Sequence, residues 1–162
     1  AYLFGTNHQI RLIEPWSIRV NVMMLDVAAN ALVDYNAANV NYGVIFFHDK
    51  TGAYEDGMTV EEMTTQGDAL VYSKDNNNTW IAANGVNVVY DKGIYTHELN
   101  TNLYCLPYVV VDGVYYYRSS VICWNLLNEM ETFSQNTSLS AEEIAVFNAM
   151  LDLHEKTMAY RG

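Results

Sequence analysis

The chain has 162 residues, of which 51% are hydrophobic and 17% charged, a balance that excludes a disordered chain and predicts one globular domain over 1–162. Nineteen acidic residues against eight basic ones give a formal net charge of −11. A negative field of this size repels phosphate groups and anionic lipid head groups, so we expect neither nucleic acid nor a membrane surface among the partners.

Composition also bears on location. No apolar run is long enough for a transmembrane helix, so no membrane insertion is expected. Thirteen tyrosines with five phenylalanines are typical of secreted or surface β-proteins. The sequence begins at Ala1 and has no signal-peptide pattern, so we interpret it as a processed protein or as one segment of a larger one, extracellular or at the cell surface.

The first fifty residues predict strands separated by turns. Two strands, at 8–14 and 17–25, are interrupted at Pro15, and apolar and polar residues alternate in the second. The alanine-rich segment 26–35 predicts a short helix or a loop. The segment 42–48, YGVIFFH, predicts a strand that is too apolar to be exposed on both faces.

The next fifty residues are more polar. Thr59 and Glu62 have the spacing of a capping box, which predicts a short helix. Strand patterns follow at 69–73, 80–82 and 86–90, and 93–99 is a connector or a short strand.

The clearest signal in the chain is a hairpin within 103–120. Two β-rich runs flank Asp112-Gly113, a dipeptide that favours a type I′ turn because both central residues need a positive φ. This turn predicts the cross-strand pairs Val111–Val114, Val110–Tyr115, Val109–Tyr116 and Tyr108–Tyr117. Both faces of the resulting ribbon are apolar or aromatic, so we expect cover on both sides.

The last forty residues are helical in pattern. Residues 121–130 have helical spacing, a loop is predicted at 133–137, and Ser140 with Glu143 forms a second capping box. The helix that follows runs to about Arg161, and its apolar stripe consists of Ile144, Phe147, Leu151, His154 and Met158. We expect this helix to cover one face of the sheet.

Three motifs are considered for chemistry. The sequence 49–52, DKTG, resembles the phosphorylated core of P-type ion pumps, but Ala53 follows it and no membrane span exists, so a turn is favoured. The four histidines are scattered, and His97 with Glu98 would suit acid–base chemistry if folded beside another carboxylate, but a surface or core-edge histidine is favoured. His154, on the apolar stripe, is interpreted as a hydrogen-bonded packing residue.

Two further patterns leave alternatives open. The segment 75–78, with Asp56 or Asp91, offers oxygen ligands for calcium, but the EF-hand pattern is absent and a plain turn is favoured; no other metal and no cofactor are expected. Cys105 and Cys123 are compatible with a disulfide, although buried free thiols are favoured.

The tyrosines of the hairpin are the strongest candidates for a binding surface. One face of the ribbon could form a flat aromatic platform, because aromatic rings stack on the apolar faces of sugars. The alternative, which we favour, is that the rings pack under the C-terminal helix. The candidate ligand-binding residues are Trp16, Trp80, Tyr104, Tyr108, Tyr115 and Tyr117.

Most of the chain resembles a β-sandwich module that recurs in large secreted and cell-surface proteins of gut and anaerobic Firmicutes. Segment 10–22, IRLIEPWSIRVNV, is similar to the opening strand pair of that module, and the hairpin is similar to its aromatic hairpin signature. The other matching segments are YGVIFF at 42–47, GIYTHEL at 93–99 and AMLDLHEKTMAY at 149–160. This sequence departs from the pattern at Trp16-Ser17, where the module has a small residue and a glycine, and at His154, where glycine is common.

The resemblance implies a non-catalytic module that sits beside enzymes, carbohydrate-binding domains or S-layer-anchoring domains, and it transfers no functional residue. We therefore expect a mainly β fold: an antiparallel sandwich of immunoglobulin or fibronectin character, with strands over about 8–120 and a helical segment over about 121–161.

The expected function is that of a structural or adhesion module, with glycans or neighbouring protein domains as partners, and not that of an enzyme. One alternative is a carbohydrate-binding module that uses the aromatic residues. Another is a component of a phage virion or filament, in which the apolar start, 1–4, pairs with a neighbouring molecule.

Overall fold

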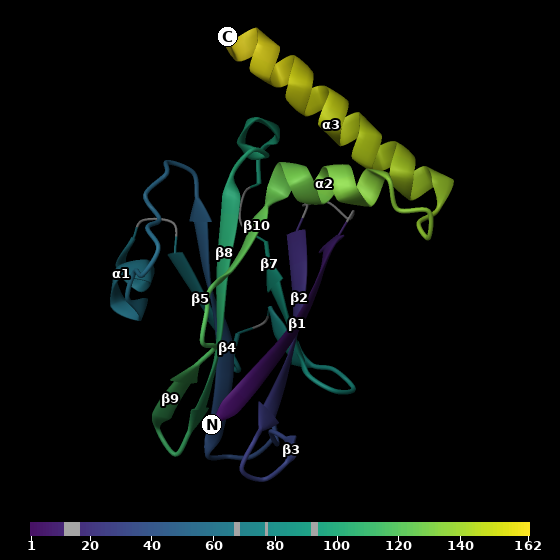
Figure 1. Cartoon of the computed structure of the whole chain (residues 1–162). Helices are drawn as coiled ribbons and strands as arrows, with labels where there is room; N and C mark the ends of the chain where they lie inside the picture. The colour runs from purple at the N-terminus through teal and green to yellow at the C-terminus, as the bar shows by residue number, and fades with distance from the viewer. Residues whose placement is uncertain (12–16, 67–68, 77, 92–93) are drawn as a thin grey trace.

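The computed structural model describes residues 1–11, 17–66, 69–76, 78–91 and 94–162, and shows a mainly β protein with the two C-terminal helices at one end (Figure 1). Two antiparallel sheets pack face to face. The first sheet has the strand order β1-β2-β7-β6, with β3 on β2, and the second has the order β10-β8-β4-β5, with β9 on β8. Between β1 and β10, the chain crosses from one sheet to the other three times.

The elements have the following bounds. The strands are β1 (Tyr2–Arg11), β2 (Ser17–Asp26), β3 (Ala31–Leu32), β4 (Val40–Asp49), β5 (Ala69–Ser73), β6 (Thr79–Ile81), β7 (Val86–Tyr90), β8 (Asn102–Val111), β9 (Val114–Tyr117) and β10 (Ile122–Asn125). The helices are α1 (Val60–Thr65), the 3₁₀ helix η1 (Thr96–Glu98), α2 (Leu126–Ser134) and α3 (Ala141–Arg161).

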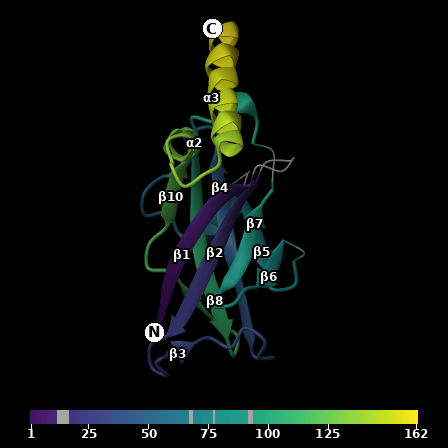
Figure 2. The same cartoon turned by 90° about the vertical axis from the view of Figure 1, so that its right-hand side faces the viewer.

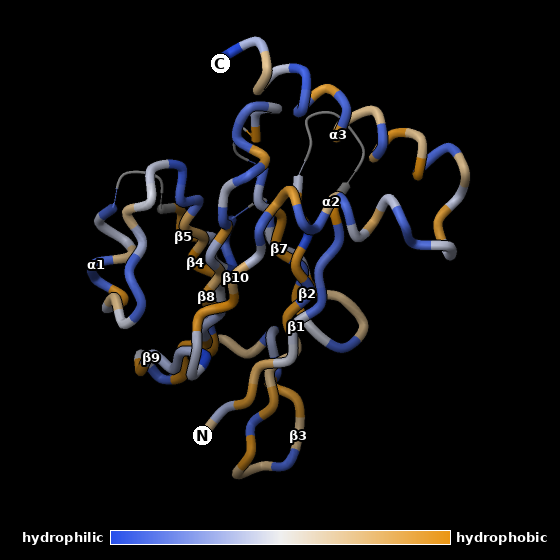
Figure 3. The backbone as a smooth tube through the Cα atoms, turned by 45° about the horizontal axis from the view of Figure 1, so that its top comes forward, coloured by the Kyte–Doolittle hydropathy of each residue, from blue (hydrophilic) through white to orange (hydrophobic). Residues whose placement is uncertain are grey.

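The main core lies between the two sheets. Alternation in β2 directs Val20 and Val22 inward, where both are fully buried, and it leaves Asn21 on the outer face. Val44 and Phe46 of β4 contribute from the opposite sheet and are also fully buried. Figure 3 shows hydrophobic residues gathered in these central strands. Burial of this apolar surface is the dominant force that joins the sheets.

The predicted hairpin is confirmed in turn and register. Val111 lies opposite Val114 and Tyr108 opposite Tyr117, and the turn residues Asp112 and Gly113 have φ values of 51° and 78°. The backbone N–H of Asp112 donates to the carbonyl of Asn39 at 3.0 Å, and the Asn39 amide donates back to the Asp112 carboxylate at 3.0 Å. The turn is therefore fixed to the start of β4.

Most predicted strands lie within two residues of their observed bounds, but two regions differ by more. The first strand begins at Tyr2 rather than at residue 8, because it pairs with β2 along its whole length. Residues 122–125 form strand β10 instead of the start of a helix, since Ile122 lies opposite Cys105 and Trp124 opposite Leu103. Pairing with β8 thus outweighs a helical spacing in the local sequence. Helix α2 then begins at Leu126.

The C-terminal helix lies elsewhere than we expected. Helix α3 packs on α2 and η1 at the end of the sandwich, around the buried residues Leu99, Met130, Phe147 and Met150, rather than across a sheet face (Figures 1 and 2). Part of the outer face of the second sheet is covered instead by α1, whose Met63 is fully buried against Phe47 and Leu106. Both capping boxes, at Thr59 and at Ser140, are confirmed.

Candidate functional site

Three tyrosines form a cluster on the outer face of the second sheet, which we call the tyrosine surface: Tyr108, Tyr115 and Tyr117. The ring centroid of Tyr108 lies 5.8 Å from that of Tyr115 and 5.9 Å from that of Tyr117, and the rings of Tyr115 and Tyr117 stack at 6.0 Å. Tyr115 is 58% exposed, whereas Tyr108 is buried. The surface thus consists of two accessible rings on a buried base.

The hairpin register and one glycine build this surface. Tyr117 lies opposite Tyr108 on the paired strand, and Tyr115 is two residues away on the same face. Gly43 of β4 lies beneath Tyr108: a Cβ atom there would come within 2.1 Å of the Tyr72 carbonyl oxygen and 2.5 Å of the Tyr108 hydroxyl. A residue without a side chain is therefore required for the Tyr108 ring to pack on β4.

Burial also fixes the protonation of this group. It raises the pKa of Tyr108 to about 12, and the neighbouring hydroxyls of Tyr115 and Tyr117 add to the rise. Burial raises the pKa of Tyr117 as well. Both phenols stay neutral at physiological pH, and they can donate as well as accept hydrogen bonds.

Tyr104 belongs to a separate contact. Its ring stacks on Tyr54 with centroids 3.6 Å apart and planes inclined by 16°. Cys123 pairs with Tyr104 across the strands and is exposed, whereas Cys105 is buried in the core between the sheets. The two thiols are free and lie on opposite faces of the second sheet, so the prediction of free thiols is confirmed, but burial holds only for Cys105.

The six candidate binding residues do not share one surface. The structure brings together Tyr108, Tyr115 and Tyr117, and it places Trp80 on β6 of the other sheet, 40% exposed. Trp16 lies outside the described residues. The tyrosines pack beneath neither C-terminal helix, since α2 and α3 contact the end of the sandwich.

His97 and Glu98, the predicted acid–base pair, each interact with another residue. The Nε2 atom of His97 is 3.7 Å from Oε1 of Glu98, too far for a hydrogen bond, and the Lys50 ammonium lies 3.4 Å from Oε2 of the same carboxylate. The imidazole of His97 stacks on Tyr95 at 5.9 Å. Glu98 thus forms an ion pair on a 3₁₀ helix rather than a hydrogen-bonded dyad with His97.

Two other histidines form hydrogen bonds that join elements. His154 is buried, and its Nδ1 atom lies 2.7 Å from the carbonyl oxygen of Thr96, which links α3 to η1 as a packing residue would. The imidazole of His8, on β1, lies 2.8 Å from the Glu129 carboxylate of α2.

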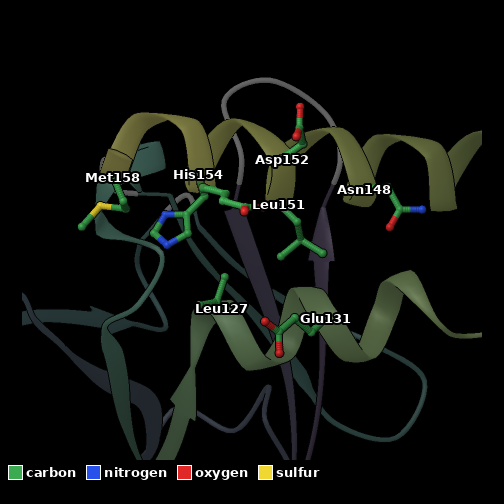
Figure 4. Close-up of a pocket in the computed structure, with 8 residues that line it drawn as sticks. Leu127, Glu131, Asn148, Leu151, Asp152, His154 and Met158 are labelled. Carbon is green, nitrogen blue, oxygen red and sulfur yellow. The ribbon is translucent and has the colours of Figure 1, made fainter. Parts of the chain in front are cut away.

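A groove that the sequence did not reveal lies between α2 and α3 (Figure 4). Its volume is about 580 Å³, and Leu127 and Glu131 of α2 face Leu151, Asp152 and Met158 of α3 across it. Leu151 and Met158 belong to the predicted apolar stripe. Which element that stripe faces depends on how α3 packs on α2. Local sequence carries no signal for that packing.

The calcium alternative finds little support in the loop that suggested it. The side-chain oxygen of Asn76 accepts the backbone N–H of Asn78 at 2.8 Å, as expected for a turn, and Asp91 accepts the Tyr72 hydroxyl at 2.9 Å. Asn77 lies outside the described residues. Within the described part of the chain, no group of three or more His, Cys, Asp or Glu side chains is placed to hold a metal ion.

Comparison of the chain with protein-family models, with curated proteins and with solved structures gives no match. None of the helices in the described segments is both long enough and apolar enough to cross a bilayer.

Proposed function

We propose that the chain is a non-catalytic structural or adhesion module of an extracellular or cell-surface protein, a sandwich of immunoglobulin or fibronectin character related to the Firmicutes module that it resembles. Two stacked antiparallel sheets, joined by repeated crossings of the chain, are in keeping with that fold character. The contacts of His97 and Glu98 give no support to a catalytic role for either residue.

The observation that carries this proposal is the exposure of strand β9. Val114, Tyr115 and Tyr116 are 51%, 58% and 37% exposed, so apolar side chains are accessible on both faces of the strand. Among the residues that the structure describes, strand β9 pairs with β8 alone, so its other edge has no strand partner among them. Tyrosine-rich, accessible edge strands suit contacts with another protein, because they offer aromatic area together with free backbone groups.

The partner that fits this surface is a neighbouring protein domain. Tyr116 contacts Tyr2 of β1 at 4.8 Å, so one face of β9 is backed by the chain itself and the face with Tyr115 remains for the partner. Because the chain carries a net charge of −11, we expect the partner surface to be neutral or basic. The start of the chain, which suggested pairing between molecules of a filament, pairs here with β2 of the same chain.

Tyrosine nitration tests this proposal without knowledge of the partner. The purified chain and the chain in the surface assembly of its source cells are treated with the same mild nitrating reagent, and each tyrosine is quantified by peptide mass spectrometry. Tyr115 is expected to react in the purified chain and to be protected in the assembly. Tyr95, which is 60% exposed, is the matched control and should react equally in both. Equal reaction of Tyr115 in both samples would overturn the proposal.

A separate assay tests the absence of catalysis. The purified chain is incubated with a panel of soluble glycans, and the products are separated by chromatography. No bond cleavage is expected. Turnover that disappears in His97→Ala or in Glu98→Gln would replace this proposal with an enzymatic function.

A further inference from the structure

One row of polar side chains crosses the first sheet from edge to edge. Asn7 of β1 lies opposite Asn21 of β2, Asn21 lies opposite Asn87 of β7, and Asn87 lies opposite Trp80 of β6. We call these four residues the amide row. Neighbouring strands lie about 4.8 Å apart, so the row extends over about 14 Å. Figure 2 turns these four strands toward the viewer.

Strand alternation directs the row away from the core. The residues beside Asn21, Val20 and Val22, are fully buried between the sheets, so Asn21 lies on the outer face. In β7, Val86 and Val88 flank Asn87 and are fully buried between the sheets, so Asn87 points to the outer face, where its neighbours leave it 9% exposed. Three amides and one indole therefore share the outer surface of a sheet whose inner surface is apolar.

The sheet is hollowed along this row. A shallow, open depression of about 370 Å³ is lined by the three asparagines of the row and by Gln9, Arg19 and Asn84, together with His8. Arg19 is the only permanently charged residue among these described lining residues. Trp80 lies at one end of the row, 40% exposed. The depression thus offers mainly uncharged donors and acceptors, and the Trp80 indole lies next to it, opposite Asn87 on the paired strand.

The amides retain capacity for a ligand. The Nδ2 atom of Asn21 donates to Oδ1 of Asn87 at 3.1 Å, and this bond fixes the orientation of both groups. Each amide has two N–H donors and an oxygen with two lone pairs, so one shared bond leaves further donors and acceptors. These are accessible chiefly on Asn21, because Asn87 is only 9% exposed. A ligand with closely spaced hydroxyl groups, each of which donates and accepts, is complementary to such a row.

We infer that the amide row binds a neutral saccharide chain, whose hydroxyl groups bond to the amides while one ring stacks on Trp80. The net charge of −11 repels polyanions, and the polar row does not suit a purely apolar ligand. Because both β1 and β6 are edge strands, a saccharide that is longer than the row can extend beyond the sheet at either end. The site therefore accepts internal segments of a polysaccharide.

This inference does not depend on the proposed protein contact, since Tyr115 and the amide row lie on different sheets. It uses Trp80 as a candidate binding residue but not the tyrosines. The competing explanation is that the asparagines only strengthen the sheet, as a ladder of hydrogen-bonded amides does. The two explanations differ in a measurable way, because a ladder without a ligand affects stability alone.

The experiment is affinity electrophoresis and isothermal titration of the purified chain with neutral β-glucan, xylan, mannan and chitin oligosaccharides of increasing length. We expect one of these to bind, with affinity that rises with length until the row is filled. Trp80→Ala should weaken binding about 5- to 150-fold, the range found for loss of one aromatic stack on a nucleobase. Trp80→Phe should restore part of the affinity, and Asn21→Ala should weaken binding.

Tyr160→Ala, at a 92% exposed aromatic position on α3, is the matched control and should bind as the unmodified chain does. Each variant is checked by circular dichroism and by its unfolding midpoint, so that loss of binding is separated from loss of structure. Absence of binding to every neutral saccharide at millimolar concentration overturns the inference. So does binding that Tyr115→Ala abolishes and Trp80→Ala leaves intact. A change in stability with unchanged affinity in Asn21→Ala would assign the row to the sheet alone.

Discussion

Among single residues, Tyr72 links the two sheets through a buried hydroxyl. It lies on β5, and its hydroxyl donates to the carboxylate of Asp91, which follows β7 of the other sheet, at 2.9 Å. Burial, followed by the hydrogen bond to Asp91, raises the pKa of Tyr72 to about 12. Folding thus favours the protonated phenol, which couples the stability of the sandwich to alkaline pH.

Tyr72→Phe is expected to lower the free energy of unfolding by about 1 kcal/mol at pH 8, the net value of one buried hydrogen bond. The unfolded phenol ionises near pH 10, below the folded value, so its stabilising contribution is complete below pH 10 and is lost as the pH rises toward 12. The difference between the unmodified chain and the variant should therefore shrink over this range.

Urea unfolding between pH 8 and pH 11.5 checks this expectation. Tyr160→Phe, at a position that is 92% exposed, is the control and should follow the unmodified chain at every pH. A difference between Tyr72→Phe and the unmodified chain that stays constant with pH would contradict the assigned role.

The elements show which parts of the fold local sequence can predict. The β8–β9 hairpin was predicted residue by residue, because Asp112 and Gly113 specify a turn and the turn specifies the register. Strand β10 and the position of α3 were not, since each depends on which distant element it contacts. Local sequence patterns predict elements that short-range signals specify, such as a turn or a helix cap. They do not predict which elements pack against one another.

The candidate site divides in the same way. The grouping of Tyr115 and Tyr117 with Tyr108 follows from the hairpin alone. The separation of Trp80 from them follows from the pairing of β6 with β7, which places the indole opposite Asn87. Hydrophobic periodicity contains no information on that pairing. The sequence alone therefore does not show that Trp80 and the hairpin tyrosines lie on different sheets.

Phe147 is one of the buried residues that attach helix α3 to α2. Its ring stacks on Phe133 of α2 at 5.5 Å and is buried, while apolar residues recur along the whole length of the helix (Figure 3). Phe147→Ala is expected to cost about 3–5 kcal/mol, chiefly in the docking of α3. Hydrogen exchange should accelerate in α3, while the amides of the two sheets keep their protection.

Val146→Ala is the neighbouring control, because Val146 is 41% exposed and its truncation removes little buried area. It should leave exchange in α3 nearly unchanged. If Phe147→Ala instead unfolds the sheets together with the helix, α3 is an integral part of the core and the expectation is wrong.

At the scale of the whole molecule, the charge of −11 opposes compaction. Like charges repel one another across the folded surface, and salt screens them over about 10 Å at 0.1 M ionic strength. We expect the melting temperature to rise by a few degrees between 10 mM and 500 mM NaCl at pH 7, as measured by calorimetry.

Repeating the calorimetry near pH 4.5, the isoelectric point calculated from the sequence, provides the control. The net charge is close to zero there, so the rise should largely disappear. A salt effect of equal size at both pH values would point to preferential exclusion of salt from the surface rather than to screening.

The three crossings of the chain between the sheets have a consequence for how the molecule folds. Strand β2 obtains its inner neighbour only when β7 is made, and β4 obtains its longest partner only when β8 is made. Neither sheet can be completed from one continuous stretch of chain, so folding requires contacts between distant segments and is slow for the size of the chain. During synthesis the first sheet lacks a strand until the ribosome has passed residue 90, and the second sheet until it has passed residue 125.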